Sequence, residues 1–302
     1  HPFFGLIYRK DMVAEAGLDP SKPPRTWDEF FYWCQRLTFP EKDVAGARLQ
    51  RGQRAYGLYP YPWFWLPWMQ SAGGSPIVQS RTSPTTGKSY DFPMEETEFI
   101  APDTGEDLSG QPSTWRATFD SPAGIAAARF YHKLRWAPWI RDPETEEPVN
   151  LSEEDVARGQ VTVRGRPLTF SEEDVFRGVV RPCIGQDQDV RAMFARGEVA
   201  MFQWNVEALQ TYGAQAGIPP HLIGMMPFPS ASEEHKRVFQ VHKHYYAMST
   251  CVGDRPKRER DKVWECLKVL TSTEVRDRGI RAQVMTGNAM WCRPDDLRRL
   301  GL

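Results

Sequence analysis

The sequence predicts an α/β fold in which helices cover a sheet. Segments with the period of a strand alternate along the chain with segments that have the period of an amphipathic helix. Apolar residues make up 40% of the 302 residues, which is enough to bury one large core or two moderate ones. No run approaches the roughly 20 uninterrupted apolar residues that a membrane-spanning helix requires. We therefore expect one large α/β domain or two lobes.

The first elements are expected to be a strand, a short helix and a longer helix. The apolar pattern predicts the strand over residues 6–8 and a short helix that ends at Gly17. The longer helix is predicted over residues 27–37. Thr26 is its expected N-cap, and Glu29 completes a T-x-x-E capping box.

Aromatic side chains crowd residues 56–74, YGLYPYPWFWLPWMQSAGG, which prolines interrupt and a glycine pair ends. The apolar residues of this segment are not confined to one helical face. The segment therefore either packs on two sides or presents its aromatic rings to a ligand. The whole chain carries 11 Trp, 10 Tyr and 16 Phe, more than a core of this size ordinarily needs. Sugar recognition is one use for such rings, because the C–H face of a pyranose stacks on them.

The middle of the chain alternates irregular and helical segments. Residues 75–118 are rich in turn-forming residues and predict an irregular excursion with a short hairpin. Ser121-Pro122 then begins a helix that runs to about Trp136. The segments 151–159, LSEEDVARG, and 170–178, FSEEDVFRG, echo each other, and each is expected to form a short capped helix that a glycine stops. Cation binding by their carboxylates is the alternative.

The last third continues the alternation. Helices are predicted over residues 188–195, 205–215, 262–271 and 273–284, and strands over residues 199–203 and 241–250. His242 and His244 share one face of the last strand, but no carboxylate or cysteine lies at ligand spacing nearby. We expect pocket-edge or solvent-facing histidines there and no metal. The charged run KRERDK at 257–262 is expected to face solvent.

Charge and cysteine usage exclude several classes of protein. A net charge of -1 gives no overall attraction to nucleic acid or to an anionic membrane. The five cysteines form no CxxC pair, and we expect most of them to be small buried apolar residues, with a reactive or metal-bound thiol as the alternative. They are Cys34, Cys183, Cys251, Cys266 and Cys292. No cofactor is expected.

A series of short blocks, in one order across nearly the whole chain, resembles a known family. The most diagnostic block is KDM-x(4)-GLDP-x(2)-PP-x-TWDEF at the start. The others are the aromatic run ending in AGG, TFDSPAGIAAARFYHKL, MFARGEVAMF, GMMPFP, VWECLKVLTSTEV and TGNAMWCRP. Together they resemble the extracellular solute-binding proteins of family 1, the maltose-binding type of carbohydrate-binding protein of ABC importers.

The resemblance implies the type II fold of periplasmic binding proteins, in which two α/β lobes close about a hinge around a ligand. It implies a protein that does no chemistry on its sugar and delivers it to a membrane permease. It also implies an extracytoplasmic location, in the periplasm or lipid-anchored at the outer face of the cytoplasmic membrane, although the chain shows no export signal. A monomer is expected, with no nucleic-acid partner.

Compared with that family, the chain looks truncated at both ends. Residues 1–218 are expected to form the second lobe, with irregular insertions near 75–118 and 140–187. Residues 219–275 are expected to be a crossing segment of the first lobe. Residues 276–302 are expected to form a hinge loop and return to the second lobe.

The resemblance also suggests where the ligand binds. Trp63 is the first choice, because it lies ten residues before Gly73 and similar proteins place a sugar-stacking ring at about that distance. Trp65 and Trp68 are further choices, and a core position is the alternative for all three tryptophans. Trp204, Asn205 and Glu207 follow a strand that ends at the cleft in the family, and helix capping is the alternative for Asn205. Further contacts are expected at Gly73, Gly74, Tyr245, Tyr246, Gly287, Trp291 and Arg293.

Two other functions remain open at this stage. A glycoside hydrolase would also use aromatic residues and carboxylates, but it needs two carboxyl groups across a cleft, one with a raised pKa. The acidic residues here cluster in polar, helix-starting segments instead. A structural or adhesive surface protein would expose its aromatic residues on a flat patch.

Overall fold

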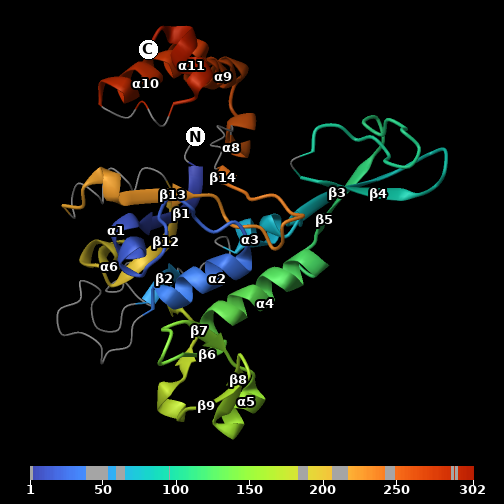
Figure 1. Ribbon diagram of the computed structural model, residues 1–302. Coiled ribbons are helices and arrows are strands. Elements are labelled where there is room, and N and C mark those ends of the chain that lie inside the picture. The colour runs from blue at the N-terminus through green and yellow to red at the C-terminus, as the bar shows by residue number, and fades with distance from the viewer. Residues whose placement is uncertain are drawn as a thin grey trace. The chain divides into compact units, whose positions relative to one another are not determined.

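The computed structural model describes residues 3–38, 54–58, 65–94, 96–182, 190–205, 217–241, 249–286, 289 and 292–302 (Figure 1). By their contacts the residues fall into two compact units, one of residues 4–240 and one of residues 241–302 together with residues 1–3. The larger unit mixes helices and strands, so the predicted α/β class is confirmed.

The larger unit is built on a mixed six-stranded sheet. Five strands lie in the order β11-β2-β12-β1-β13, and β14 also pairs with β1. β2, β11 and β12 are parallel, whereas β1 runs antiparallel to both β12 and β13. The strands are β1 (Phe3–Arg9), β2 (Arg54–Leu58), β11 (Val180–Pro182), β12 (Val199–Asn205), β13 (Ile223–Met226) and β14 (Gln240–Val241).

The first helices lie where the sequence predicts them. α1 (Lys10–Glu15) is followed by Gly17 in the left-handed conformation, at φ +75. α2 (Trp27–Arg36) begins after Thr26, whose hydroxyl accepts a hydrogen bond from the Glu29 N–H at 3.3 Å. The Glu29 carboxylate accepts from the N–H of Arg25 at 2.6 Å, one residue earlier than a capping box requires.

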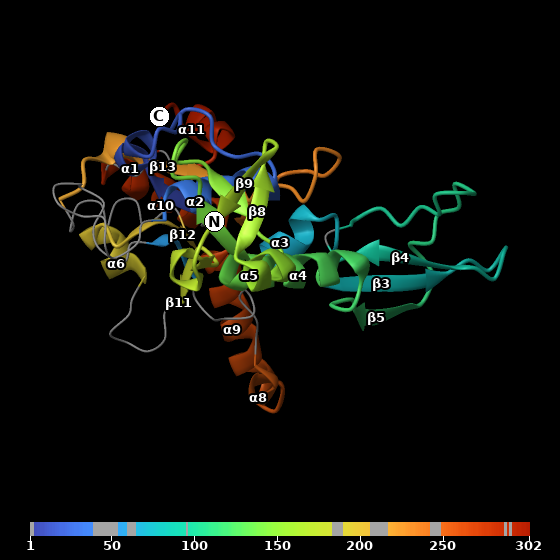
Figure 2. The ribbon, with the colours of Figure 1, turned by 60° about the horizontal axis from the view of Figure 1, so that its bottom comes forward.

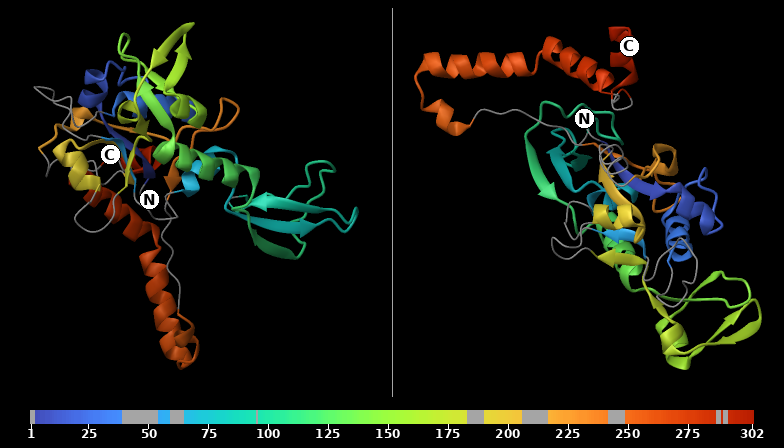
Figure 3. Two further views of the ribbon diagram at one scale, coloured as in Figure 1. Left: turned by 90° about the horizontal axis from the view of Figure 1, so that it is seen from below. Right: turned by 90° about the vertical axis from the view of Figure 1, so that its left-hand side faces the viewer.

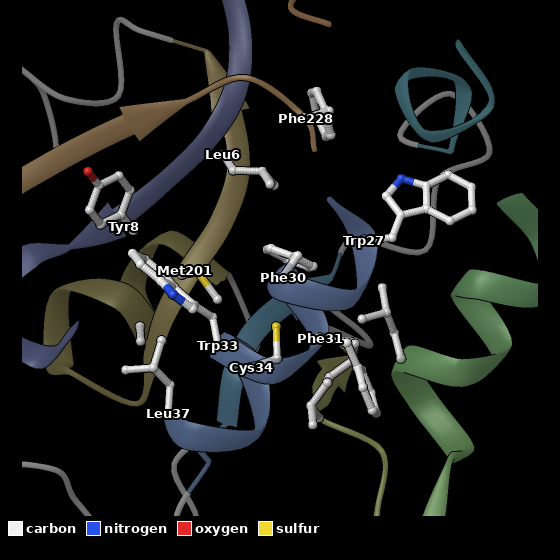
Figure 4. Close-up of a cluster of buried hydrophobic side chains, with 14 of the residues drawn as sticks. Leu6, Tyr8, Trp27, Phe30, Phe31, Trp33, Cys34, Leu37, Met201 and Phe228 are labelled. Atoms are coloured by element: carbon white, nitrogen blue, oxygen red, sulfur yellow. The ribbon is translucent and has the colours of Figure 1, made fainter. Parts of the chain in front are cut away.

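Helix α4 (Pro122–Trp136) begins as predicted, because the Ser121 hydroxyl accepts from the Gly124 N–H at 3.2 Å. With α2 and the short α3 (Leu66–Ser71), it encloses the main apolar core. Figure 4 shows part of this core, in which Phe30 of α2 lies near Leu6 of β1 and Met201 of β12, and Cys34 lies one turn further along the helix. Burial raises the pKa of the Cys34 thiol well above its ordinary value.

The cysteines only partly follow the prediction. Among the four that the structure describes, Cys34 alone is buried; Cys251 and Cys266 are exposed and Cys292 is partly exposed. The expectation that most are buried is therefore wrong for the described ones. The three that depart from it belong to the smaller unit, whose helices α9 (Lys257–Leu270), α10 (Thr273–Met285) and α11 (Pro294–Leu300) bury no side chain.

Residues 75–118 are more ordered than the sequence suggests. β3 (Ile77–Thr82) pairs with both β4 (Ser89–Pro93) and β5 (Ser113–Ala117), in the order β4-β3-β5 (Figure 2). One side carries a small separate core of Tyr90, Phe92, Ala101 and Leu108. The expected short hairpin is present as β3 and β4, but the prediction that the rest is irregular is wrong, because β5 completes a three-stranded sheet with its own core.

A second insertion lies between α4 and β11. It holds the sheet β10-β6-β7 and the hairpin of β8 and β9. These strands are β6 (Pro138–Arg141), β7 (Pro148–Asn150), β8 (Gln160–Val163), β9 (Arg166–Thr169) and β10 (Phe176–Arg177), and the insertion also contains the helix α5 (Glu153–Arg158).

The two echoing segments of this insertion fold differently. The first forms α5 with a complete capping box of Ser152 and Asp155, as predicted. The second makes only a 3-10 turn at Glu172–Asp174 and then joins the sheet as β10. Phe176 stacks on Trp139 with ring centroids 4.1 Å apart, whereas the first copy has Ala157 at that position. This contact favours the strand over a second helix.

The remaining elements follow the predictions in part. α6 (Val190–Arg196) precedes β12. The strand predicted over 241–250 is seen only at Val241, since Thr250 opens α8 (Thr250–Gly253) and residues 242–248 lie outside the described part. α9 (Lys257–Leu270) begins five residues earlier than expected, with the exposed run 257–262 in its first turns.

The smaller unit consists of α8, α9, α10 (Thr273–Met285) and α11 (Pro294–Leu300), which end the chain (Figure 3). Within α9, α10 and α11 no side chain is buried, and large apolar residues such as Trp264 and Met285 are exposed. Of the helices that the structure describes, none combines the length and apolar character needed to cross a membrane.

Candidate functional site at one edge of the sheet

The strand register brings the ends of β2 and β12, which the sequence places next to predicted site residues, to one edge of the central sheet. β2 and β12 are parallel, with Gly57 opposite Phe202, so both strands end at the same edge. β1 is antiparallel, and its Phe4 lies directly opposite Asn205 at the end of β12. In open α/β sheets, ligands bind in the crevice outside the carboxyl ends of the strands. In the sequence Trp63 follows the end of β2 by five residues and Glu207 follows the end of β12 by two, and both lie outside the described residues.

Trp204 is the best defined of the predicted residues at this edge. Its ring is partly buried, and its centroid lies 6.4 Å from that of Phe4 at a tilt of 56°. The guanidinium of Arg191, from α6, lies 5.1 Å from the centroid of the same ring. Packing and a cation–π contact therefore hold the indole in place at the end of β12. The side chain of Asn205 and all of Glu207 lie outside the described residues.

Trp65 is the first residue described after β2, and it lies at the start of a helix. It precedes α3, and its carbonyl accepts hydrogen bonds from the N–H groups of Trp68 at 3.0 Å and Met69 at 3.3 Å. Its partly buried ring lies 5.8 Å from the exposed ring of Phe119, between centroids. Trp65 thus keeps some indole surface accessible within an aromatic pair.

Trp68 lies in the core, which is the alternative that the sequence leaves open. Its side chain is 0% exposed and has the rings of Phe30, Phe130 and Phe228 within 5.3 Å, between centroids. A ring enclosed in this way has no face for a ligand, so we leave Trp68 out of the proposed site.

The glycine pair has a structural explanation. Gly73 adopts φ +78, a left-handed conformation that ends the turn after α3. At Gly74 a Cβ atom would lie only 2.6 Å from the Cβ of Ala123, so a glycine is needed for close approach to the start of α4. Backbone conformation and packing therefore explain why glycine occupies both positions, without a ligand. Contact of Gly73 and Gly74 with a ligand stays a prediction.

Most other predicted site residues lie outside the described part of the chain. These are Trp63, Glu207, Tyr245, Tyr246, Gly287 and Trp291, as well as His242 and His244. Arg293 is described in the smaller unit, where it is exposed and its carbonyl accepts from the Leu297 N–H of α11 at 3.1 Å.

Three side chains near the predicted residues were missed by sequence reasoning. Phe4 and Arg191 contact Trp204, and Phe119 contacts Trp65. Phe119 falls inside one of the blocks that carry the family resemblance, TFDSPAG, and an exposed ring just before a helix cap is the signal that was available. Phe4 and Arg191 have no local signal, because their contacts depend on strand pairing.

A separate hollow of ≈ 640 Å³ lies on another face of the larger unit, along the C-terminal half of α4. It is lined by Arg129, His132, Lys133, Trp136, Ala137, Pro138, Glu153 and Arg177. It contains none of the predicted site residues. Its Arg177 is engaged by Glu153 and Glu172, at 3.1 and 3.0 Å.

Comparison with known proteins supports part of the predicted resemblance. Residues 1–135 match the family of bacterial extracellular solute-binding proteins. For this part of the chain the family predicted from the short blocks is confirmed. No curated protein matches the chain significantly.

Several solved structures are similar to the chain over part of their own length. An ABC transporter solute-binding protein from Thermotoga lettingae, bound with alpha-D-tagatose, is 18% identical with a TM-score of 0.42, over 93% of this chain and 50% of that one. Maltose-bound MalE3 from T. maritima is 16% identical with a TM-score of 0.42, over 92% and 50%. An ABC substrate-binding protein from Listeria monocytogenes in complex with cycloalternan is 12% identical with a TM-score of 0.46, over 99% and 56%. The chain spans about half the length of these proteins.

Proposed function

We propose that this chain, whose residues 1–135 match the bacterial extracellular solute-binding proteins, forms part of the extracytoplasmic carbohydrate-binding component of an ABC importer. It captures its sugar at the edge where β2 and β12 end, and hinge closure presents the loaded protein to a membrane permease. It works as a monomer, in the periplasm or lipid-anchored outside the cytoplasmic membrane, and leaves the sugar chemically unchanged.

The register of β2 and β12 is the observation that carries this proposal. It brings the ends of β2 and β12, at Leu58 and Asn205, to one edge, although they are 147 residues apart in the chain. A sugar needs an apolar ring face beneath it and polar groups around its hydroxyls. Trp63 and Trp204 provide the rings, and the polar groups come from Asn205, the last residue of β12, and from Glu207, two residues later in the sequence.

The lobe assignment is part of the same proposal. Residues 1–218 form the second lobe, residues 219–275 belong to the first, and residues 276–302 contain the hinge loop and return to the second. Several apolar residues of α9 and α10 are exposed, among them Trp264, Val269 and Val275. Their exposure supports the proposal that another part of the protein packs on these helices. In this proposal other elements of the first lobe cover them.

The described carboxylates favour binding over hydrolysis. A glycosidase needs a carboxylic acid whose pKa is raised so that it can donate a proton. Among the described residues, the aspartates with a shifted pKa all have it lowered. In Asp142 the hydrogen bond from the Glu144 N–H is the first cause, and in Asp155 it is the hydrogen bond from the Ser152 hydroxyl. Such groups stay ionised at neutral pH.

Calorimetric titration of the chain with glucose, maltose and longer oligosaccharides tests the proposal. We expect saturable binding with a change in Trp fluorescence, and no release of reducing sugar during incubation. Trp63→Ala should weaken binding by a factor of about 3 to 10, the equivalent of one stacked ring. Trp264→Ala, which alters a tryptophan 51% exposed on α9, is the matched control and should bind as the unchanged chain does. Flat titrations with every sugar would contradict the proposal.

A further inference from the structure

The hollow of ≈ 640 Å³ beside the C-terminal half of α4 lies between this helix and the second insertion (Figure 1). The helix contributes Arg129, His132, Lys133 and Trp136 to its lining. Their spacing of i, i+3, i+4 and i+7 places these four side chains on one face of α4. The insertion contributes single side chains from β6, α5 and β10. The volume is within the range of about 300–1,000 Å³ that small-molecule sites occupy.

The backbone fixes the two walls of this hollow against each other. The Gly178 N–H donates to the Ala137 carbonyl at 3.0 Å, directly after α4. Gly178 adopts φ +66, and a Cβ atom there would overlap the carbonyl of Arg135, so the insertion packs with its main chain on the end of the helix. Arg177, the preceding residue, is thereby held beside α4. The shape of the hollow therefore follows from the fold itself.

Two of the cations in the lining are already paired. Arg177 is engaged by two glutamates, as described above, and Lys133 donates to Asp28 at 2.8 Å. Arg129 and His132 are exposed, and among the described residues neither side chain has a hydrogen bond or an ion pair. A guanidinium, and an imidazole one turn away from it, are therefore free to bind an anion.

The dipole of α4 does not account for Arg129. Basic side chains stabilise a helix when they lie in its last turn, where Lys133 and Arg135 are found. Arg129 lies seven residues before Trp136, the last residue of the helix, or about 10 Å along the axis, where the effect of the dipole has faded. An unpaired guanidinium at this position favours a ligand as its partner.

Trp136 gives the hollow a flat apolar surface. It is 50% exposed at the end of α4 and is not part of the main apolar core. The guanidinium of Arg135 lies 4.9 Å from the centroid of the indole, a cation–π contact that orients the ring. Ala137 and Pro138 are partly buried and extend the apolar surface towards the insertion. A ligand with an aromatic ring can stack here while its charged group reaches Arg129.

We propose that this hollow is a second binding site, for a small aromatic compound that carries a carboxylate or phosphate group. The guanidinium of Arg129 donates to two oxygens of the anion, His132 adds a further donor, and the aromatic ring lies against Trp136. An uncharged ligand would cover Arg129 without giving it a partner, which is unfavourable, so the hollow selects for charge. The site is separate from the sheet edge, because its lining contains no predicted sugar contact.

Calorimetric titration with two pairs of probes tests this site: AMP with adenosine, and indole-3-acetate with indole-3-acetamide. Each pair shares a ring system, and only the first member carries the oxyanion. We expect at least one of the anions to bind the unchanged chain, and to bind at least about 10 times more tightly than its neutral counterpart, because it gains hydrogen bonds to a charged group. Binding of AMP alone would assign a phosphate, and binding of indole-3-acetate alone a carboxylate. Inorganic phosphate and acetate, which lack the ring, should bind more weakly.

Arg129→Gln should lower the affinity for the anion by a factor of about 10 and leave the affinity for its neutral counterpart unchanged. Trp136→Ala should lower the affinity by a factor of about 3 to 10, whereas Trp136→Phe keeps a ring and should bind nearly as the unchanged chain does. Arg116→Gln and Trp115→Ala are the matched controls, at exposed positions on β5 outside the lining, and should leave binding unchanged. All four positions are exposed, so the variants should fold, which thermal unfolding checks.

The proposal is wrong if neither anion binds more tightly than its neutral counterpart, or if Arg129→Gln binds the anion as tightly as the unchanged chain does. It is also wrong if maltose displaces the anion or if Trp63→Ala weakens its binding, because the anion would then lie in the sugar site. Failure of this second site leaves the proposed function standing, since that function rests on the sheet edge alone.

Discussion

The indole N–H of Trp27 donates a hydrogen bond to the backbone carbonyl of Pro229 at 3.0 Å, across 202 positions of the chain. The same N–H also lies 3.1 Å from the Ser71 hydroxyl, and the ring stacks on Phe130 with centroids 4.6 Å apart. One side chain at the start of α2 therefore joins α3, α4 and the segment after β13. These contacts connect the elements that surround the apolar core of the larger unit.

Trp27→Phe tests how much the polar part of this contact contributes. The change keeps an aromatic ring in the core but removes the donor, so the Pro229 carbonyl loses a buried partner. We expect the free energy of unfolding to fall by about 1–3 kcal/mol, measured by urea denaturation. Trp264→Phe, at an exposed position on α9, should change it by less than about 0.5 kcal/mol. Equal effects of the two changes would contradict this role for Trp27.

Gly74 offers a test of whether a predicted ligand contact is needed for packing. A Cβ at Gly74 would lie 2.6 Å from the Cβ of Ala123, so Gly74→Ala should destabilise the protein by about 1–3 kcal/mol through overpacking. Removing the opposing atom with Ala123→Gly should restore part of that loss in the double variant, despite its own cost of up to about 1 kcal/mol in a helix. Thermal unfolding of the two single variants and the double variant measures this coupling. Strictly additive effects would show that the clash is not the cause.

Much of the fold could be predicted where the signal is local. The capping hydroxyls of Thr26 and Ser121 lie next to apolar residues with a helical period, and both helices begin where these signals place them. The family block that begins at Lys10 lies within the part of the chain that matches the family. Such signals involve residues within one or two turns of each other, so no tertiary contact is needed to recognise them.

What could not be predicted depends on long-range contacts. Val78 pairs with Pro93 on one side and Arg116 on the other, and no local pattern gives this register. Phe176 distinguishes two nearly identical segments only because Trp139 lies against it. Trp65 and Trp68 are three residues apart, yet only the packing of α3 against α4 determines that one keeps an accessible ring and the other does not.

The buried side chain of Arg81 holds the loop of residues 96–111 by hydrogen bonds to its backbone. It is only 9% exposed, and its Nη1 donates to the carbonyls of Leu108, Ser109 and Gln111 at 3.0, 2.9 and 2.6 Å. The guanidinium also lies 4.1 Å from the centroid of the Phe99 ring. It thereby holds residues 96–111 against the sheet.

Arg81→Lys should loosen this loop, because the lysine ammonium lies nearer the backbone than Nη1, so it reaches the three carbonyls less well, and it lacks the planar group that lies over Phe99. We expect faster proteolytic cleavage within residues 96–111 and a fall of about 1–3 kcal/mol in the free energy of unfolding. Arg116→Lys, in an exposed ion pair of the same sheet, is the control and should change stability by less than about 1 kcal/mol. Unchanged cleavage in Arg81→Lys would show that the loop is held by its apolar contacts alone.

Asp142 should contribute a pH-dependent part of the stability. Its carboxylate is nearly inaccessible and accepts hydrogen bonds from the Glu144 N–H and from Arg166, each at 3.0 Å. The hydrogen bond from Glu144 is the main cause that lowers the pKa of this carboxyl in the folded protein, and Arg166 lowers it further. Because the folded pKa is lowered, the stabilisation is complete above the unfolded value of about 3.9 and is lost as the pH falls through the folded pKa.

Asp142→Asn should therefore be less stable than the unchanged protein at pH 7, and the difference should shrink as the pH falls below about 4. Urea denaturation at a series of pH values between 7 and 2 measures this difference. The asparagine retains an acceptor for the Glu144 N–H but has no charge for Arg166, so a difference that closes in acid isolates the effect of ionisation. A difference that stays constant across this range would show that Asp142 acts through the shape of its turn and not through its charge.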